Sequence, residues 1–460
     1  MKFKFRYRIF FIALLIFSAT ASYAQRGHSM NFLSLTPQQN RFNPAFDMRY
    51  DSYLGFPVLS NIQLQLHNDA FSINSLLEMH VPSLLGSLSL QNNFGVEASL
   101  DLLSFGFRVG ETNNFFHVAL GVEAYANALF TKNSLRFLLS GPGNFVGQRD
   151  VLSGNFMNMS LYGFLSVGHS REINDRWRVG GRVKLLSGVQ NLHTERLDVD
   201  VYIHDGSNPH IVPYTYEIRP DIVVNQFSGW GPRSIIDNWG LGFDVGAVFQ
   251  ASEEWTFAAS VSDIGFINWR GDGVERTTTR NRDDPFIFTG VGRIGDIITQ
   301  EGFRIEEIFT ALVDSITDFF QLDEVDTTFT SYRSWLRTSY NISAFLNLTD
   351  NDQIGLMWNS RLGRGQQRSL TVAYTRALGR NFQVSINNAF VNNNPFNFGG
   401  GFAVNLGALQ FYFVAEKLSA FRVVNMRAVN VHFGINLVFN RPVEQNLVRQ
   451  GFVINQWSVR

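Results

Sequence analysis

The sequence predicts an all-β protein, a closed antiparallel transmembrane β-barrel of about 14 strands with long extracellular loops. Three observations predict it. Many short segments alternate apolar and polar residues with the period of two that a β-strand imposes. Short turns alternate with long connections along the chain. The 460 residues also include 44 phenylalanines and 39 glycines, an enrichment typical of barrels that face lipid.

The N-terminus predicts secretion. Basic residues precede an apolar run over residues 9–17, and small residues follow up to Ala24. This is the order of a secretory signal peptide over residues 1–24, whose cleavage would leave Gln25 as the first mature residue. An apolar run of about nine residues is too short to span a bilayer about 30 Å thick, which disfavours a helical anchor. We therefore expect the protein to reach the cell outer membrane.

Composition excludes several classes of function. The formal net charge of −1 argues against a nucleic-acid partner. The chain has no cysteine, which excludes disulfides, thiolate chemistry and a lipid-anchored lipoprotein. The histidines are scattered and no phosphate-binding loop is complete, so we expect neither a metal nor a cofactor.

The strands fall into two sets separated by a long connection. The expected ranges are 61–66, 96–109, 116–126, 159–167, 177–185, 239–249 and 255–261, and then 340–348, 354–358, 370–374, 382–386, 398–406, 409–415 and 431–439. Together they make roughly fourteen strands, and single-chain bacterial barrels have an even number.

Connection lengths support a barrel. Short turns rich in turn formers cover residues 110–114, 171–175, 251–254, 350–352, 379–381 and 407–408. They alternate with long loops over residues 67–94, 130–156, 191–238 and 268–335, so short turns lie on one side of the membrane and long loops on the other. The longest loop is expected to hold an amphipathic helix over residues 305–320, either as a lid for an apolar ligand or as a cap on the barrel mouth.

Charged residues of the strands keep to the inward face. Because a lipid-facing Lys or Arg costs about 2 to 4 kcal/mol at mid-membrane, a lipid environment would enforce this segregation. Opposed charges in the lumen could set the ion preference of a pore, or they could neutralise one another and stiffen the interior. The expected lumen charges are Glu97, Asp101, Glu123, Arg178, Arg182, Lys184 and Asp244.

One strand changes face along its length. In residues 96–109 the apolar positions switch parity between Leu102 and Leu103. A single extra residue there, a β-bulge, would restore one continuous lipid face. A strand that simply ends near this point would give the same pattern.

The last expected strand is the most regular. In residues 430–439 every second side chain is apolar. His432, Gly434, Leu437 and Phe439 follow the spacing of the terminal strand that the barrel-assembly machinery recognises in bacterial outer-membrane barrels, which this segment resembles. We therefore expect assembly machinery and membrane lipids as partners.

Three features together resemble FadL-type outer-membrane barrels, and more closely an uncharacterised group of Bacteroidota outer-membrane proteins. They are Asn43, Pro44 and Ala45 just before the first strand, the run SVSDIGFINW over residues 260–269, and the strand number. In FadL-like proteins an N-terminal segment plugs the lumen and a kinked strand opens a sideways exit for hydrophobic substrates. The resemblance implies a plug over residues 25–50 and makes the bulge at Leu102 and Leu103 a candidate kink. We expect the barrel itself over residues 51–440 and a periplasmic tail over residues 441–460.

Function is expected from this architecture. The favoured interpretation is a passive transporter or channel for a small molecule, with a hydrophobic ligand as one option. The alternative is a non-transporting scaffold or secretion-associated barrel that binds partner proteins. We do not expect an enzyme, because a hydrolase would need a serine or carboxylate arranged around His169 or His193, and no spacing in the sequence supports one.

Overall fold

The structure is a computed structural model of the 460-residue chain. It describes residues 29–68, 85–109, 114–140, 142–149, 152–204, 214–228, 234–279, 286–290, 325–363, 367–391, 394–416 and 428–440. The expected signal peptide, the helix over residues 305–320 and the C-terminal tail lie outside the described residues.

The predicted closed, antiparallel 14-strand barrel is confirmed, and each predicted strand coincides with a strand of the wall. The first wall strand consists of two pieces, β1 (Tyr50–Gly55) and β2 (Ile62–Asn68). The others are β3 (Gln91–Val109), β4 (Asn114–Thr131), β5 (Phe156–Asn174), β6 (Trp177–Ile203), β8 (Trp239–Gln250), β9 (Trp255–Trp269), β14 (Ser339–Asn347), β15 (Asp352–Arg361), β16 (Gln367–Ala377), β17 (Phe382–Val391), β18 (Asn394–Leu406), β19 (Leu409–Glu416) and β20 (Ala428–Asn440).

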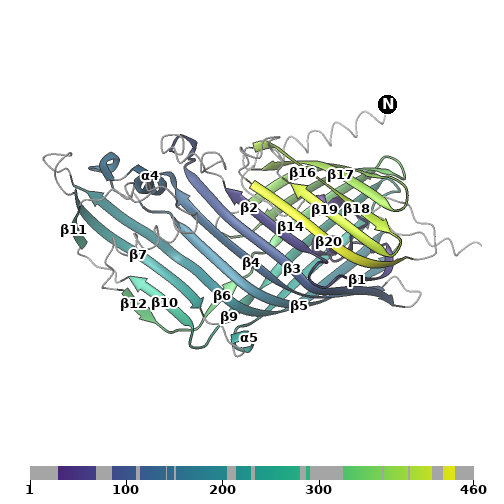
Figure 1. Ribbon diagram of the computed structural model, residues 1–460, viewed down its shortest axis with the longest axis horizontal. Helices are drawn as coiled ribbons and strands as arrows, with labels where there is room; N and C mark the ends of the chain where they lie inside the picture. The colour runs from purple at the N-terminus through teal and green to yellow at the C-terminus, as the bar shows by residue number, and fades with distance from the viewer. Residues whose placement is uncertain are drawn as a thin grey trace, which may run out of the picture.

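The last strand closes the barrel. β20 pairs with β19 on one side and with β1 and β2 on the other. Figure 1 shows β20, in yellow, running beside β1 at one end of the barrel. Closure leaves no strand edge exposed to hydrocarbon, where an unpaired backbone group would cost several kcal/mol. Among the described residues, no helix is both long and apolar enough to cross a membrane.

The first strand is broken between Gly55 and Ile62. Gly55 pairs with Asn436 and Ile62 pairs with Phe433. A step of seven residues along the first strand therefore matches a step of only three along β20. The four extra residues form an excursion in which Val58 has a φ of 66°. A Cβ on Gly434 would collide with the carbonyl oxygen of Ser60, so a glycine is needed where the excursion crosses β20.

A β-bulge lies beside this break. The register of β3 against β4 shifts between Asp101 and Leu103, which leaves Leu102 as the extra residue. Both apolar runs of β3 are therefore brought onto the outer face, and Leu102, Leu103 and Phe107 are all exposed.

The wall alternates as a lipid-facing barrel requires. In β14 the inward Asn341, Ser343 and Phe345 are buried, whereas Ile342 points outward and is exposed. The same alternation places all seven expected lumen charges inside the barrel, where each is buried or largely covered. The lipid faces and lumen faces are thus those expected from sequence.

Part of the long loops is strand rather than loop, which corrects the expectation for residues 191–238 and 268–335. β6 continues beyond the barrel and pairs with β7 (Tyr214–Ser228), which in turn pairs with β10 (Val274–Thr279) and β11 (Phe286–Gly290). β12 (Val325–Thr328) pairs with β10, and β13 (Tyr332–Trp335) pairs with β9. The extended part of β6 still alternates, but its apolar Val199, Val201 and Ile203 are buried within the extension and do not face outward as the apolar side chains of the wall do.

Figure 1 shows the extension at the end of the barrel opposite β1. Short helical segments accompany the loops: α4 (Lys132–Ser140), η3 (Pro142–Phe145) and α5 (Ser234–Asp237). Phe137 of α4 and Phe145 of η3 are buried. The extension therefore has a small apolar core of its own.

A charge on the lipid face tests the membrane position of the wall. Ile386 lies in the middle of β17, and Leu406 lies at the rim beside the turn at Gly407. Their exposures are nearly equal, 61% and 62%. We expect Ile386→Arg to lower the free energy of unfolding in lipid vesicles by about 2 to 4 kcal/mol, and Leu406→Arg by about 0 to 1 kcal/mol. Equal losses in urea titrations would contradict this placement of the bilayer.

Candidate functional site

The N-terminal segment, residues 29–48, occupies the lumen and packs one side of it tightly. Two short 3-10 helices, η1 (Ser29–Phe32) and η2 (Pro37–Arg41), carry eight of its buried residues. Its apolar residues form one cluster with inward side chains of the β14–β19 wall: Met30, Phe32, Leu33, Leu35, Phe42, Ala45, Phe46, Phe345, Met357, Ala373, Ala403, Tyr412 and Val414. Phe345 meets Phe32 and Phe46 edge to face, at 5.9 and 6.1 Å between ring centroids.

Polar contacts hold the same segment along the wall. Gln38 and Asn436 form a reciprocal amide pair at 2.7 and 3.0 Å. The backbone N–H of Leu35 donates to Gln383 at 3.1 Å, and Ser29 contacts Glu416 at the segment's first described residue. Most buried amides and hydroxyls of the segment are satisfied in this way, and the side-chain nitrogen of Asn40 is the exception among its described residues.

The Asn43-Pro44-Ala45 tripeptide docks into a glycine notch. Asn43 accepts a hydrogen bond from the N–H of Ala45 at 2.9 Å and donates to the carbonyl oxygens of Ala247 and Ala259 at 3.3 and 3.2 Å. A Cβ on Gly180 of β6 would lie 2.6 Å from the Ala45 nitrogen, and one on Gly246 of β8 would lie 2.8 Å from the Asn43 Cγ. These glycines let the two backbones approach closely.

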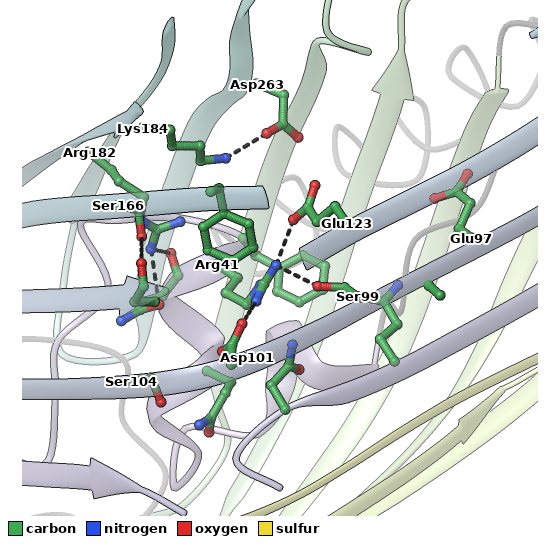
Figure 2. Close-up of a pocket in the computed structure, with 18 of the residues that line it drawn as sticks. Arg41, Glu97, Ser99, Asp101, Ser104, Glu123, Ser166, Arg182, Lys184 and Asp263 are labelled. Carbon is green, nitrogen blue, oxygen red and sulfur yellow. Dashed lines mark hydrogen bonds and ion pairs between the residues drawn. The ribbon is translucent and has the colours of Figure 1, made fainter. Parts of the chain in front are cut away.

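Arg41 ties the other side of the segment to the wall. Its guanidinium pairs with Asp101 of β3 and, at 2.7 Å, with Glu123 of β4, and it donates to Ser99 at 2.8 Å. Figure 2 shows this side chain in the middle of the pocket, reaching all three partners. The Tyr162 hydroxyl also donates to Glu123, at 2.7 Å.

A second charged group lies on β6, β8 and β9. Asp244 is fully buried and pairs with Arg182 and Lys184, both at 3.0 Å. Lys184 also reaches Asp263, at 2.5 Å. Arg182 donates to the carbonyl oxygen of Asn40 at 2.9 Å, so this group too contacts the N-terminal segment. The contacts explain how four charges share a space largely closed to water.

The two charged groups line one polar pocket between the N-terminal segment and the β3–β6 wall. The centre of a water-sized molecule can occupy about 80 Å³ of it. Arg41 and Phe42 of the N-terminal segment border it. The wall contributes charged side chains from five strands, β3, β4, β6, β9 and β15, together with hydroxyls such as Ser99, Ser104 and Ser166 (Figure 2). The lumen is therefore divided into a packed apolar side and a charged, open side.

Glu97 forms a third charged group with residues that the sequence did not single out. It pairs with Arg337 at 2.8 Å and with Arg361 at 2.7 Å. All three residues border the same pocket. Arg337 also stacks on the Tyr125 ring, with its guanidinium carbon 4.9 Å from the ring centroid.

The remaining predicted site residues lie elsewhere. Arg178 pairs with Asp47 at 2.7 Å, and neither residue borders the pocket. Of the expected assembly signal, His432 borders the pocket, Gly434 meets the first-strand excursion, Leu437 pairs with Leu409, and Phe439 is exposed on the outside.

Four charged partners that border the pocket were missed from sequence: Arg41, Asp263, Arg337 and Arg361. Asp263 lies within the 260–269 run but beyond the predicted end of its strand, and Arg361 lies beyond the predicted end of β15. Inward parity in a longer β15 could have found Arg361. Asp263 has the outward parity of β9 and turns inward only where the β8–β9 register shifts and its own φ is 60°, so alternation alone could not have found it. Arg41 and Arg337 lie outside regular strands, where no periodicity points to them.

His169 and His193, considered for a hydrolase, contact amide side chains. His169 Nε2 lies 3.0 Å from Asn114 Oδ1, and His193 Nδ1 lies 3.1 Å from Asn158 Oδ1. His169 also stacks on Phe116, with 4.5 Å between ring centroids. Neither arrangement places a nucleophile on a histidine base.

Comparisons with known proteins return one family and several barrels. The model of a family of unknown function, DUF5723, matches residues 44–416. The fold is similar to a FadL homologue of Pseudomonas aeruginosa, with 9% identity and a TM-score of 0.43 over 92% of this chain and 100% of that one. It is also similar to the toluene transporter TodX of Pseudomonas putida, with 8% identity and a TM-score of 0.40 over 92% and 95%. No curated protein matches the sequence.

The glycine notch gives a prediction for docking of the N-terminal segment. Because the chain lacks cysteine, a single Ser34→Cys change provides a buried reporter whose reaction rate with a water-soluble maleimide measures undocking. We expect Gly180→Ala or Gly246→Ala to raise this rate at least about tenfold, because the added methyl displaces the tripeptide. Gly181→Ala is the control, since its Cβ would meet nothing nearer than 3.7 Å. Equal rates in all variants would contradict the notch.

Arg41 gives a second prediction with the same reporter. Removing one partner of a buried ion pair costs roughly 3 to 5 kcal/mol, and we expect the low end because Arg41 is 22% exposed. Arg41→Gln should therefore raise the labelling rate at position 34. The double variant Arg41→Gln with Asp101→Asn should recover part of the loss, because it leaves one fewer unpaired carboxylate. If the fold-increase in labelling rate of the double variant equalled the product of the fold-increases of the two single variants, Arg41 and Asp101 would not be coupled.

Proposed function

The chain belongs to the DUF5723 family of unknown function, and we propose that this member is a passive outer-membrane channel for a small solute, held closed by its N-terminal segment. The barrel supplies the route through the membrane. Residues 29–48 block that route inside the lumen, and nothing in this role requires covalent chemistry.

The division of the lumen carries the proposal. On the β14–β19 side the N-terminal segment is packed with apolar and aromatic side chains, and opening a gap there would expose them to water. On the β3–β6 side its contacts are ion pairs and hydrogen bonds from Arg41 and Asn40 to the wall. Water can replace such contacts at small net cost. The segment therefore yields most easily on its polar side, which is where the pocket lies.

The pocket favours a polar solute over a hydrophobic one. Charged side chains from the wall and from the N-terminal segment surround it, and burying an apolar molecule among them would strand those charges without water. The hydrophobic ligand considered from sequence gains no support from this lining. We therefore propose a small hydrophilic solute.

The route runs along the barrel axis. A sideways exit of the FadL kind would lie at the break in the first strand, beside the bulge at Leu102. Two hydrogen bonds seal that position: Phe56 N–H to the Ile435 carbonyl at 3.0 Å, and Val58 N–H to the Leu102 carbonyl at 3.1 Å. Apolar side chains face outward there, whereas the charged groups inside face the axis. These contacts favour axial passage.

A scaffold that binds partner proteins is the second candidate, and the extension formed by β6, β7, β10, β11 and β12 favours it. This sheet continues beyond the membrane wall and carries ion pairs at its surface, among them Arg219 with Glu217 at 2.6 Å. If this is the main role, partners captured from native membranes by the intact protein should be lost when Arg219 and its neighbours are substituted, while solute flux stays absent in every variant.

A reversible lock tests the channel. A Cβ at position 246 would lie 2.8 Å from the Asn43 Cγ, close to the separation that a disulfide needs, so Asn43→Cys with Gly246→Cys should cross-link the N-terminal segment to β8. We expect vesicles bearing the oxidised protein to be tight to small hydrophilic solutes, and addition of a reductant to raise flux.

The control lock joins two wall strands. Thr375 and Ser385 are paired across β16 and β17 with their hydroxyls 2.9 Å apart, so Thr375→Cys with Ser385→Cys closes a bridge without touching the N-terminal segment. Reduction of this control should leave flux unchanged. If both double variants gave the same flux before and after reduction, the N-terminal segment would not be the gate.

A further inference from the structure

The ion pairs of Glu97 cross the whole barrel. Glu97 lies on β3 and Arg361 on β15, and their side chains meet at 2.7 Å. Counting along the wall through β4, β5, β6, β8, β9 and β14, β15 is seven strands from β3. Counting the other way, through the first strand and β20 to β16, it is again seven. The pair therefore joins diametrically opposite strands.

Arg337 strengthens this bridge from a third direction. It precedes β14 in the chain, and its Nη1 donates to the same Glu97 oxygen, Oε1, that Arg361 Nη1 contacts. Two guanidinium groups thus converge on one oxygen atom, and the formal charge of the three side chains sums to +1. Each guanidinium has five N–H donors in a planar fork, a geometry that matches carboxylates and phosphates.

The bridge is reachable from the pocket. Glu97, Arg337 and Arg361 all border it, and the side chains of Glu97 and Arg337 are 12% and 20% exposed. The Tyr125 ring supports one face of the Arg337 guanidinium, which orients its donors. A solute in the pocket therefore meets oriented donors already arranged around an oxyanion.

Building on the channel function proposed above, we propose that the Glu97 bridge is a binding site for an oxyanion of the passing solute, a carboxylate or a phosphate. The solute oxyanion takes the place of the Glu97 carboxylate on Arg337 and Arg361. Since this exchanges one anion for another on the same donors, it releases the cross-lumen contact without leaving either guanidinium unpaired. The solute thereby opens the bridge that bars its way.

Exchange also explains how such a site can serve transport. A solute must bind strongly enough to enter and weakly enough to leave. Glu97 is a competitor fixed at the site, so it weakens every oxyanion that binds and returns to the guanidiniums when the solute departs. Competition from Glu97 keeps the affinity of Arg337 and Arg361 for a solute oxyanion low. Removing the Glu97 carboxylate must therefore raise this affinity.

This competition predicts opposite effects for neighbouring substitutions. The experiment titrates the purified full-length protein in lipid nanodiscs with succinate and with inorganic phosphate, at constant ionic strength, by isothermal calorimetry. Glycerol is the neutral probe. Arg361→Gln should weaken succinate binding roughly tenfold or more, because a charge-assisted hydrogen bond is lost. Glu97→Gln should tighten it several-fold, because the competing carboxylate is gone.

The controls separate the site from general effects of charge. Arg276→Gln removes an arginine whose ion pair with Glu195, at 2.8 Å, lies outside the pocket, and it should leave binding unchanged. Arg337→Gln repeats the test if Arg361→Gln does not fold. Tighter binding of phosphate than succinate, or the reverse, identifies which oxyanion the site prefers and supports the proposal in both cases.

Two results would overturn the proposal. If Glu97→Gln weakened succinate and phosphate binding as much as the arginine variants do, the trio would be a structural strut and not a site. Binding of glycerol as tight as that of succinate would also exclude an oxyanion site. Flux through vesicles is measured in parallel. Flux that shows no preference for oxyanions would support the channel and contradict the oxyanion site. Opposite effects of Arg361→Gln and Glu97→Gln on binding, without any flux, would support the site and contradict the channel.

Discussion

Closure of the backbone hydrogen-bond ladder is the constraint on which the rest of this structure depends. Hydrocarbon offers no partner for an N–H or C=O group, so a sheet that crosses a membrane must end where it begins. β20 meets this requirement by pairing along its length with β1 and β2. Even the break in the first strand obeys it, because Phe56 and Val58 donate across the gap. Once the sheet is closed, every second side chain is committed to an interior sealed from lipid.

That interior combines two kinds of contact with different responses to water. The apolar cluster around Phe345 resists opening because it would lose buried area, whereas the ion pairs of Arg41 exchange with water at little net cost. The glycine notch at Gly180 and Gly246 fixes the height of the N-terminal segment between them. The diametric pair of Glu97 and Arg361 adds a second barrier across the lumen. The N-terminal segment is thus held more firmly on its apolar side, and its release begins on its polar side.

The wall strands were predictable because contact with lipid requires apolar side chains at every second position. Each lipid-facing strand alternates, and the switch of parity at Leu102 located the bulge in β3 without a structure. The inward set of Glu97, Asp101, Arg182 and Asp244 followed from the same alternation. The pattern of outward apolar side chains does not extend to the strands beyond the barrel, so the sequence predicts loops there. Asp263 and Arg361 also lie past the predicted limits of their strands. Arg41 sits in a segment without periodicity, so its partners emerge only from the three-dimensional arrangement.

The central claim is that residues 29–48 are a docked, releasable segment within a permanently closed wall. Hydrogen–deuterium exchange measured by mass spectrometry on the protein in nanodiscs tests this most directly, because amides of a releasable segment exchange through its undocked state while wall amides exchange only when the barrel unfolds. The account predicts that peptides covering residues 29–48 exchange far faster than peptides from β14 to β19, against which they pack. Equal, slow exchange of both would show a segment that is a fixed part of the core, and the channel account would be wrong.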